Sequence, residues 1–147
     1  MALREKSAGI ILFRRTEQGN KYLLLHYEAG HWDFVKGHIE EDESEKETAI
    51  RELKEETSIT KFQLYPDFRE KLSFFYKRDN KLIHKEVIYF LAETSEEKVR
   101  LTEHLEYKWL PFEQALNQTT FKNSQQILKK AKEHIRLQDS LKKLIRK

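Results

Sequence analysis

The sequence predicts an α/β fold in which a mixed central sheet lies between helices, as an α/β/α sandwich. Apolar, strand-like segments occur both before and after one central amphipathic segment, which indicates a sheet whose strands flank a helix along the chain. A longer amphipathic segment near the C-terminus predicts a further covering helix. With 147 residues the chain has the length of one domain with its own core, so we expect a single domain over residues 1–147.

Two apolar segments near the N-terminus predict the first strands. Residues 7–15 (SAGIILFRR) have the composition of a buried strand, and residues 21–27 (KYLLLHY) follow after a short polar turn. Residues 29–35 then lead into Lys36-Gly37-His38. Aromatic and basic side chains mixed in a loop indicate the wall of a pocket, and we expect a flexible glycine between two side chains able to bind phosphate.

The central segment predicts a helix that begins after Ser44. Ser44 and Glu47 have the spacing of a capping box, in which each side chain hydrogen-bonds the backbone N–H of the other residue. Apolar side chains recur on one side of this helix, which predicts the face that packs on the sheet. They are Ala49, Ile50 and Leu53.

The segments after this helix predict the rest of the sheet. Residues 62–68 are expected to be irregular. Residues 69–76 and 85–92 are expected to form an antiparallel pair, joined by a polar loop over residues 77–81. A short strand is expected at residues 107–110.

The C-terminal part of the chain is predicted to be helical and basic. Residues 112–117 predict a short helix, residues 123–135 a longer amphipathic one, and residues 137–147 a basic helical extension. Residues 122–147 carry nine Lys or Arg and two Asp or Glu, so that a net charge of +7 there leaves −4 on residues 1–121. Such a tail attracts nucleic acid, but amphipathic helices are often basic without that role.

Composition indicates a cytoplasmic protein without a membrane partner. The chain has no cysteine, which excludes disulfides and thiolate metal sites and is consistent with a reducing compartment. Its first residues lead straight into a strand, so no signal peptide is expected, and no apolar run approaches the ~20 residues of a membrane span. We expect a monomer or a weak dimer.

Three carboxylates share one face of the predicted central helix. They belong to Glu52, Glu55 and Glu56, which lie within about one turn of one another. Such a face is often merely solvated, with ion pairs like that available between Arg51 and Glu55. However, like charges repel unless a cation lies between them, and an all-oxygen cluster suits Mg²⁺ or Mn²⁺. No nucleophilic Ser, Cys or His arrangement is recognisable, so we expect direct attack by water.

The same helix resembles the signature of the Nudix hydrolase family, Gly-x5-Glu-x7-Arg-Glu-U-x-Glu-Glu-x-Gly-U, where U is a bulky aliphatic residue. The matching residues are Gly37, Glu43, Arg51, Glu52, Leu53, Glu55, Glu56 and Ile59. Ser58 stands in place of the second glycine, which serves the turn that leaves the helix rather than the metal site. The resemblance implies the Nudix fold, an α/β/α sandwich with a mixed sheet.

The family resemblance also implies roles for individual residues. Glu52 and Glu56 are expected to be metal ligands, and Glu55 to be a third ligand or to hold the metal-bound water. Arg51 is expected to orient these glutamates through an ion pair. Nudix enzymes often recruit a further carboxylate from a later loop as a ligand or general base, and Glu103 is the candidate, although taken alone it is an ordinary loop acid.

Within the family, several segments resemble the asymmetrical diadenosine tetraphosphate hydrolases. These are residues 1–4, 9–15, 23–25, 31–32 ahead of 36–38, 87–91, and 103–104 before 107–110. The chemistry of their side chains suits Lys36 and His38 to stabilise charge on the phosphates, and the resemblance implies that His31 binds substrate.

In such enzymes an aromatic residue on the central hairpin stacks on an adenine, and a nearby lysine contacts phosphates. Tyr76 and Lys85 occupy the matching positions here, although Tyr76 is equally consistent with ordinary packing on the sheet. Phe121 is a candidate for a second stacking wall.

The resemblance implies hydrolysis of diadenosine tetraphosphate to ATP and AMP, with a small nucleotide as the substrate. A second possibility is removal of pyrophosphate from an RNA 5′-end or a nucleoside triphosphate, which would use the same carboxylates. A third, of another class, is a non-catalytic nucleotide-binding regulatory module. Such modules typically lack signature acids, whereas Glu52, Glu55 and Glu56 are all present here.

Overall fold

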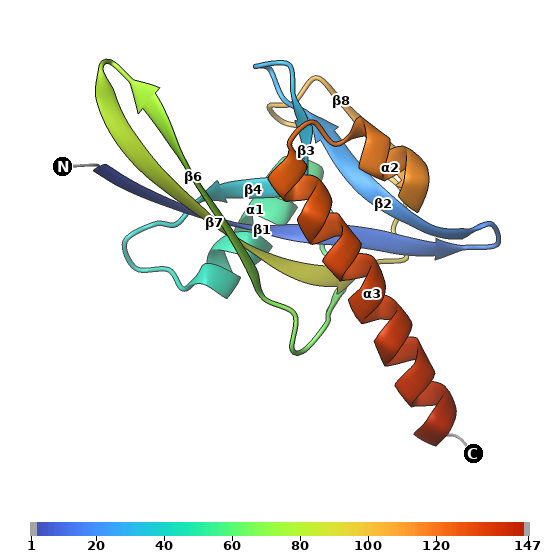
Figure 1. Ribbon diagram of the computed structural model, residues 1–147. Helices are drawn as coiled ribbons and strands as arrows, with labels where there is room; N and C mark the ends of the chain where they lie inside the picture. The colour runs from blue at the N-terminus through green and yellow to red at the C-terminus, as the bar shows by residue number, and fades with distance from the viewer. Residues whose placement is uncertain (1–2, 146–147) are drawn as a thin grey trace.

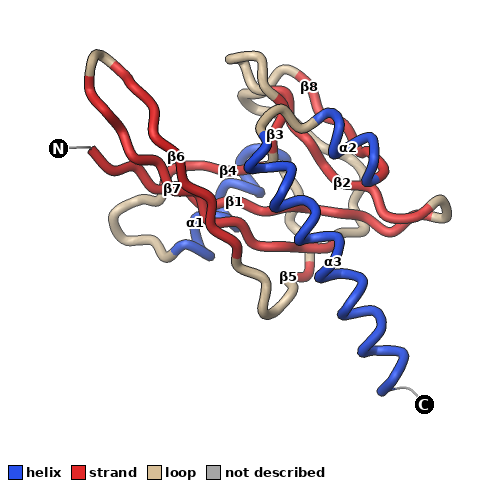
Figure 2. Tube along the Cα trace, in the orientation of Figure 1, coloured by secondary structure: helices blue, strands red, loops and turns tan. Residues whose placement is uncertain are grey.

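The computed structural model describes residues 3–145, in which a mixed sheet of eight strands lies between helices (Figure 1 and Figure 2). The predicted α/β/α sandwich is therefore confirmed. The strands are β1 (Leu3–Thr16), β2 (Gly19–His26), β3 (Trp32–Asp33), β4 (Val35–His38), β5 (Gln63–Leu64), β6 (Glu70–Arg78), β7 (Lys81–Glu93) and β8 (Glu106–Pro111). The helices are α1 (Glu45–Thr57), α2 (Phe112–Gln118) and α3 (Lys122–Ile145).

Strand β1 organises the sheet because it pairs with three other strands. It runs parallel to β7 along residues 3–13, and antiparallel to both β2 and β4. The β2 pairing uses residues 13–16 of β1, whereas the β4 pairing uses residues 7–10. The sheet therefore divides along β1, with β2, β3 and β8 on one branch and β4 on the other.

Alternating side chains of the central strands build a separate core on each face of the sheet. On one face Ile10 and Leu12 pack with Leu53 of α1. On the other face Ile11 and Phe13 pack with the apolar side of α3. The predicted inward residues of α3 are all buried there: Ile127, Leu128, Ala131 and Ile135.

Both ends of α1 are fixed by local hydrogen bonds. Ser44 and Glu47 form the predicted capping box at the N-terminal end. At the other end Ser58 has φ 63°, in the left-handed region, and its N–H donates to the carbonyl of Lys54 at 2.9 Å. The residue that replaces the signature glycine thus adopts the conformation that glycine adopts most easily.

The strands extend further than the sequence predicts. The expected polar loop at 77–81 is wrong, because β6 continues to Arg78 and β7 begins at Lys81. Only Asp79 and Asn80 form the turn, both with positive φ, as a two-residue hairpin with the right-handed sheet twist requires. The supposedly irregular residues 62–68 also contain β5, which pairs with β7.

Helix α3 is continuous from Lys122 to Ile145 and extends past the edge of the sheet (Figure 1). Residues 137–145 of the predicted basic helical extension belong to this same helix. The guanidinium of Arg15 binds the Asp139 carboxylate at 2.9 and 3.1 Å, which ties this part of α3 to β1. Residues 146–147, which end the predicted basic tail, lie outside the described residues, as do residues 1–2. Within residues 3–145, no helix is long and apolar enough to cross a membrane.

Ser58→Gly tests the strain at the end of α1. We expect the free energy of unfolding to rise by up to about 1 kcal/mol, because glycine removes the Cβ contact that disfavours positive φ, partly offset by its greater freedom in the unfolded chain. Urea unfolding measures this change, with Ser58→Val as the control of opposite sign. A destabilised Ser58→Gly variant would contradict the interpretation.

Candidate active site

The site begins at Gly37, where the side chain of Glu52 on α1 lies against the backbone of β4. A Cβ at this position would lie 2.0 Å from the carboxyl carbon of Glu52. Gly37 lies inside strand β4 and is not among the described residues with positive φ. The expected flexible loop glycine is therefore wrong. Gly37 is instead required for space, since its missing side chain leaves room for the carboxylate of Glu52.

Arg51 holds the acids of α1 and the loop before it in one network. Its Nη1 donates to Glu52 at 2.8 Å and to Glu55 at 3.1 Å. Its Nε and Nη2 donate to the two carboxylate oxygens of Glu43 at 2.6 and 2.9 Å, and Nη2 also reaches the carbonyl of His38. Arg51 is therefore placed to orient several carboxylates at once.

Glu56 is the most buried acid of the cluster on α1, with 5% of its surface exposed. Its Oε1 lies 2.8 Å from Nε2 of His104, whereas its Oε2 is buried and has no hydrogen-bond partner. Burial is the main cause that raises the pKa of Glu56 to about 8, and the charges of Glu52 and Glu103 raise it further. A buried carboxylate oxygen without a partner is costly unless another group, such as a cation, binds it.

The loop between β7 and β8 brings Glu103 to these acids. Arg100 and Thr102 anchor the loop by donating to backbone carbonyls at the C-terminal end of α1, at 2.9 and 3.1 Å. Glu103 itself is exposed and borders a hollow of about 520 Å³. Burial raises the pKa of Glu52, and the negative charge of Glu103 is among the further causes.

The donors present fit a hard divalent cation. Glu52, Glu55, Glu56 and Glu103 offer only carboxylate oxygens, which Mg²⁺ and Mn²⁺ prefer, and one of these oxygens is buried without a partner. Within residues 3–145, no three acidic or imidazole side chains are already closed around a common cation position. The acids are instead held by Arg51 and His104.

A pocket of about 320 Å³ lies on the α3 side of the sheet. Lys36 lines it, with its Nζ 3.1 Å from Oδ2 of Asp33, a carboxylate that is almost fully buried. Two half-exposed aromatic side chains, Phe74 and Phe121, also line it. The pocket therefore combines a cation with flat apolar surfaces, which suits a base linked to a phosphate.

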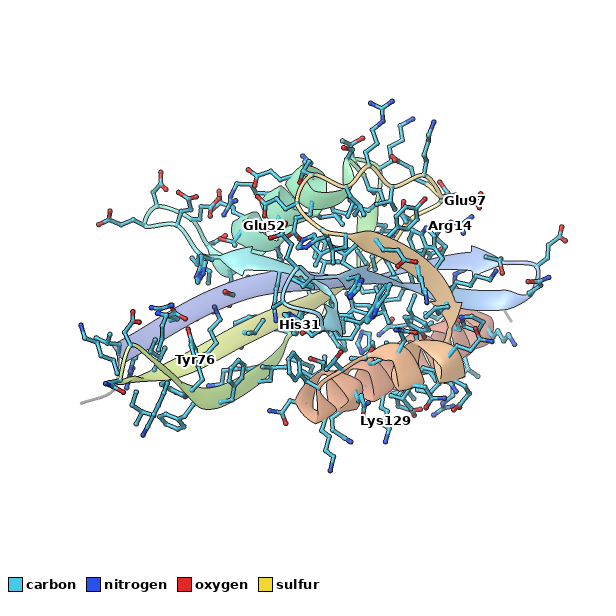
Figure 3. The ribbon with its side chains drawn as sticks, turned by 90° about the horizontal axis from the view of Figure 1, so that it is seen from above. Arg14, His31, Glu52, Tyr76, Glu97 and Lys129 are labelled. Carbon is cyan, nitrogen blue, oxygen red and sulfur yellow. The ribbon has the colours of Figure 1, made fainter. Side chains whose placement is uncertain are left out.

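A row of rings connects the acid cluster with this pocket. His31 stacks on Tyr27 with ring centroids 4.6 Å apart, and lies 5.2 Å from the ring of Phe121. Tyr27 in turn lies 4.3 Å from the ring of His104. Figure 3 shows Glu52 on α1 in one layer of the molecule and Tyr76 on the β6–β7 hairpin. Because His31 contacts Tyr27 on one side and Phe121 on the other, it lies between the acid cluster and the pocket.

Residues 3–131 of the chain match the NUDIX domain. The chain belongs to the Nudix family. The match covers most of the sequence, and the residues that resemble the signature are those that meet around Arg51 and Gly37. The family resemblance found in the sequence is therefore confirmed.

Curated relatives extend this similarity over nearly the whole chain. The asymmetrical bis(5′-nucleosyl)-tetraphosphatase of Mus musculus is 38% identical over 135 residues, which cover 83% of this chain and 88% of the relative. The Caenorhabditis elegans protein of the same name is 37% identical over 131 residues, covering 85% and 92%. A crystal structure of a C. elegans Ap4A hydrolase binary complex matches with a TM-score of 0.79 and 34% identity, over 89% of this chain and 97% of that one.

The hairpin residues expected from this Nudix subgroup lie beside the pocket rather than in its lining. The hydroxyl of Tyr76 donates to Glu5, and Nζ of Lys85 donates to Oγ of Ser7 at 2.7 Å. Burial lowers the pKa of Lys85. Tyr76 shares one face of β6 with Phe74, because alternate residues of a strand point to the same side.

His38 ends β4 and pairs with Ser7 of β1, so it lies beside Lys85 on the face that carries the pocket. It is exposed overall, and partial burial is the main cause that lowers its pKa. The structure therefore brings His38, Lys36 and Lys85 to one side of the sheet.

Sequence reasoning missed Phe74, Asp33, Tyr27 and His104. The period of two along residues 72–76 would have placed Phe74 with Tyr76. Tyr27 and Asp33 precede Lys36 in the chain, and no local sequence pattern identifies either of them as functional. His104 follows Glu103, but its contact with Glu56 joins residues 48 positions apart, and no local pattern reports that.

Gly37→Ala is expected to lower the rate of catalysis at least tenfold while leaving the protein folded. The added Cβ collides with the flexible end of Glu52, which moves and leaves its position against Arg51. Gly9→Ala is the contrasting variant, because its Cβ meets the backbone oxygen of Val35 at 2.0 Å and should destabilise the fold itself. Activity and thermal unfolding of both variants check this, and full activity of Gly37→Ala contradicts it.

Proposed function

We propose that this Nudix hydrolase cleaves the polyphosphate bridge of diadenosine tetraphosphate to give ATP and AMP. The observation that carries hydrolysis is the buried, unpartnered Oε2 of Glu56 within a carboxylate cluster, close to a pocket lined by Lys36 and two aromatic rings. The choice of substrate is supported by the asymmetrical tetraphosphatases of mouse and nematode, which resemble this chain over most of their length.

The acid cluster is proposed to hold Mg²⁺, with Mn²⁺ as a substitute. Glu52 and Glu56 are the main ligands, and Glu55 and Glu103 are further ligands or general bases. When bound, the cation neutralises phosphate charge and polarises the attacking water. Arg51 keeps Glu52 and Glu55 oriented while substrate and products exchange.

The chain's own residues bind the substrate and accept the proton. Water adds to a phosphorus atom of the bridge, the P–O bond to the leaving phosphate breaks, and one proton of the water passes to a carboxylate. Lys36, His38 and Lys85 lie on one side of the sheet, where their charges or donors stabilise the polyphosphate. In the structure the ammonium of Lys36 pairs with Asp33 and lies over the Tyr27 ring, so a bound phosphate would share it with these groups.

Flat side chains around the pocket are proposed to bind the adenine bases. Phe74 and Phe121 line the pocket, with Tyr76 on the same face of the hairpin and His31 close to Phe121. Stacking on such rings contributes ~1–3 kcal/mol per base and does not depend on base identity. We place the activity in the cytoplasm, consistent with a chain that has no cysteine, and expect a monomer or a weak dimer.

Product analysis tests the proposal. Incubated with Mg²⁺, the protein should convert diadenosine tetraphosphate to ATP and AMP, and removal of the metal with EDTA should stop the reaction. Glu56→Gln should lower kcat by about a hundredfold or more, because the amide keeps the size but loses the anionic ligand. Glu97→Gln is the matched control, because the Glu97 side chain is 79% exposed and does not belong to the acid cluster (Figure 3).

Two other substrates make the same experiment decisive. If the protein hydrolyses a 5′-triphosphorylated RNA or a nucleoside triphosphate but not the dinucleotide, the catalytic role of the acid cluster stands and the proposed substrate is wrong. Trimming residues 137–147 would then show whether the basic end of α3 serves RNA. Nucleotide binding without any turnover would instead support the regulatory module.

Phe74→Ala should raise the KM for diadenosine tetraphosphate about tenfold, through loss of a stacking surface, with little change in kcat. Phe75→Ala is a matched control, because Phe75 is 61% exposed on the opposite face of the same strand. Steady-state kinetics of both variants measure the difference. Equal KM values for the two variants would exclude the pocket as a base-binding site.

A further inference from the structure

His104 makes a buried contact with Glu56, the least accessible acid of the cluster on α1. Its Nε2 lies 2.8 Å from Oε1 of Glu56, and the two side chains are only 6% and 7% exposed. The imidazole is on the loop between β7 and β8, whereas the acid is on α1. Solvent hardly competes for this hydrogen bond, so it is stronger than the same contact at the surface.

The loop is anchored on both sides of His104. Before it, the N–H of Arg100 and the hydroxyl of Thr102 donate to backbone carbonyls of α1. After it, the N–H of Leu105 donates to the carbonyl of His26 on β2, at 2.9 Å. The ring of Tyr27 packs 4.3 Å from the imidazole. The imidazole is thus fixed by the fold rather than by its own rotamer preference.

Fixing one oxygen of a carboxylate also fixes the direction of the other. A glutamate side chain has three rotatable bonds, and helix geometry alone leaves its carboxylate free to turn. In Glu56 the oxygen held by His104 is Oε1, and the remaining Oε2 is buried without a partner. When a cation binds, Glu56 is ionised and can only accept hydrogen bonds, so that Nε2 of His104 would donate to Oε1 in that state.

We propose that His104 is a positioning residue, which holds Oε1 of Glu56 so that Oε2 stays directed at the divalent cation. The inference rests on the proposed function, because it takes the acid cluster to be the metal site. His104 acts through Glu56 rather than as a ligand, because the contact that the structure shows joins its Nε2 to Oε1 of the acid. Residues that orient metal ligands in this way change metal affinity by about 10–100-fold when they are removed.

Metal binding by the full-length protein tests this inference without relying on turnover. Mn²⁺ is the probe, and its dissociation constant is measured from the electron paramagnetic resonance signal of the free ion. His104→Phe removes the donor but keeps a flat ring beside Tyr27, and should raise the dissociation constant about 10–100-fold. His104→Gln retains an N–H donor at a similar reach and should recover most of that loss.

His84→Phe is the matched control, because His84 stacks on Phe75 of the hairpin and has no role in the site. It should bind Mn²⁺ like the wild type. In steady-state kinetics, His104→Phe should need more Mg²⁺ for half-maximal rate while the KM for the nucleotide stays unchanged. If His104→Phe does not fold, His104→Asn replaces it, because its amide is too short to reach Glu56. The same rise of about 10–100-fold in the Mn²⁺ dissociation constant is then expected.

The outcomes separate this inference from the function on which it rests. A wild-type protein that does not bind Mn²⁺, or a Glu56→Gln variant that binds it equally well, overturns both. Loss of binding in Glu56→Gln with unchanged binding in His104→Phe overturns only the role of His104. Nitrogen coupling in the spin-echo spectrum of bound Mn²⁺, lost in His104→Gln, would make His104 a direct ligand and also overturn it.

Discussion

The approach of α1 to β4 at Gly37 is the constraint on which the site depends. The carboxylate of Glu52 occupies the space where any other residue at position 37 would carry its Cβ. The missing side chain leaves room for the Glu52 carboxylate beside the sheet, where Arg51 binds it. The pairing of β4 with β1, and the burial of Leu53 under the sheet, hold the contact in place.

Grouping these acids is unfavourable for the fold, and the structure offsets that cost with fixed donors. Burial and mutual repulsion raise the pKa of both Glu52 and Glu56. Arg51 binds the more accessible acids through its forked guanidinium, while His104 reaches the buried one. Lys36 offsets part of the repulsion at Glu56, but Oε2 of this acid has no hydrogen-bond partner, as expected where a ligand binds.

Local sequence patterns predicted the features that local physics controls. The capping box at Ser44 forms as predicted, because both of its hydrogen bonds join residues three positions apart. Ala49 and Leu53 of α1 are buried as their periodicity indicates, as are the apolar residues of α3 up to Ile135. The hairpin turn was misjudged because charged residues such as Lys77 and Lys81 suggest a loop, whereas Asp79 and Asn80 alone tolerate the positive φ of the turn.

The sequence by itself determined the family, the α/β/α order of elements and the signature acids, since these depend on spacing within one helix and on the periodicity of single strands. Only the tertiary structure decided which groups meet those acids. The role of Gly37 as space for Glu52, the contact of His104 with Glu56, and the place of Phe74 in the pocket each join segments distant along the chain. Such contacts depend on how helix, sheet and loop pack together, and no local pattern of residues encodes that packing.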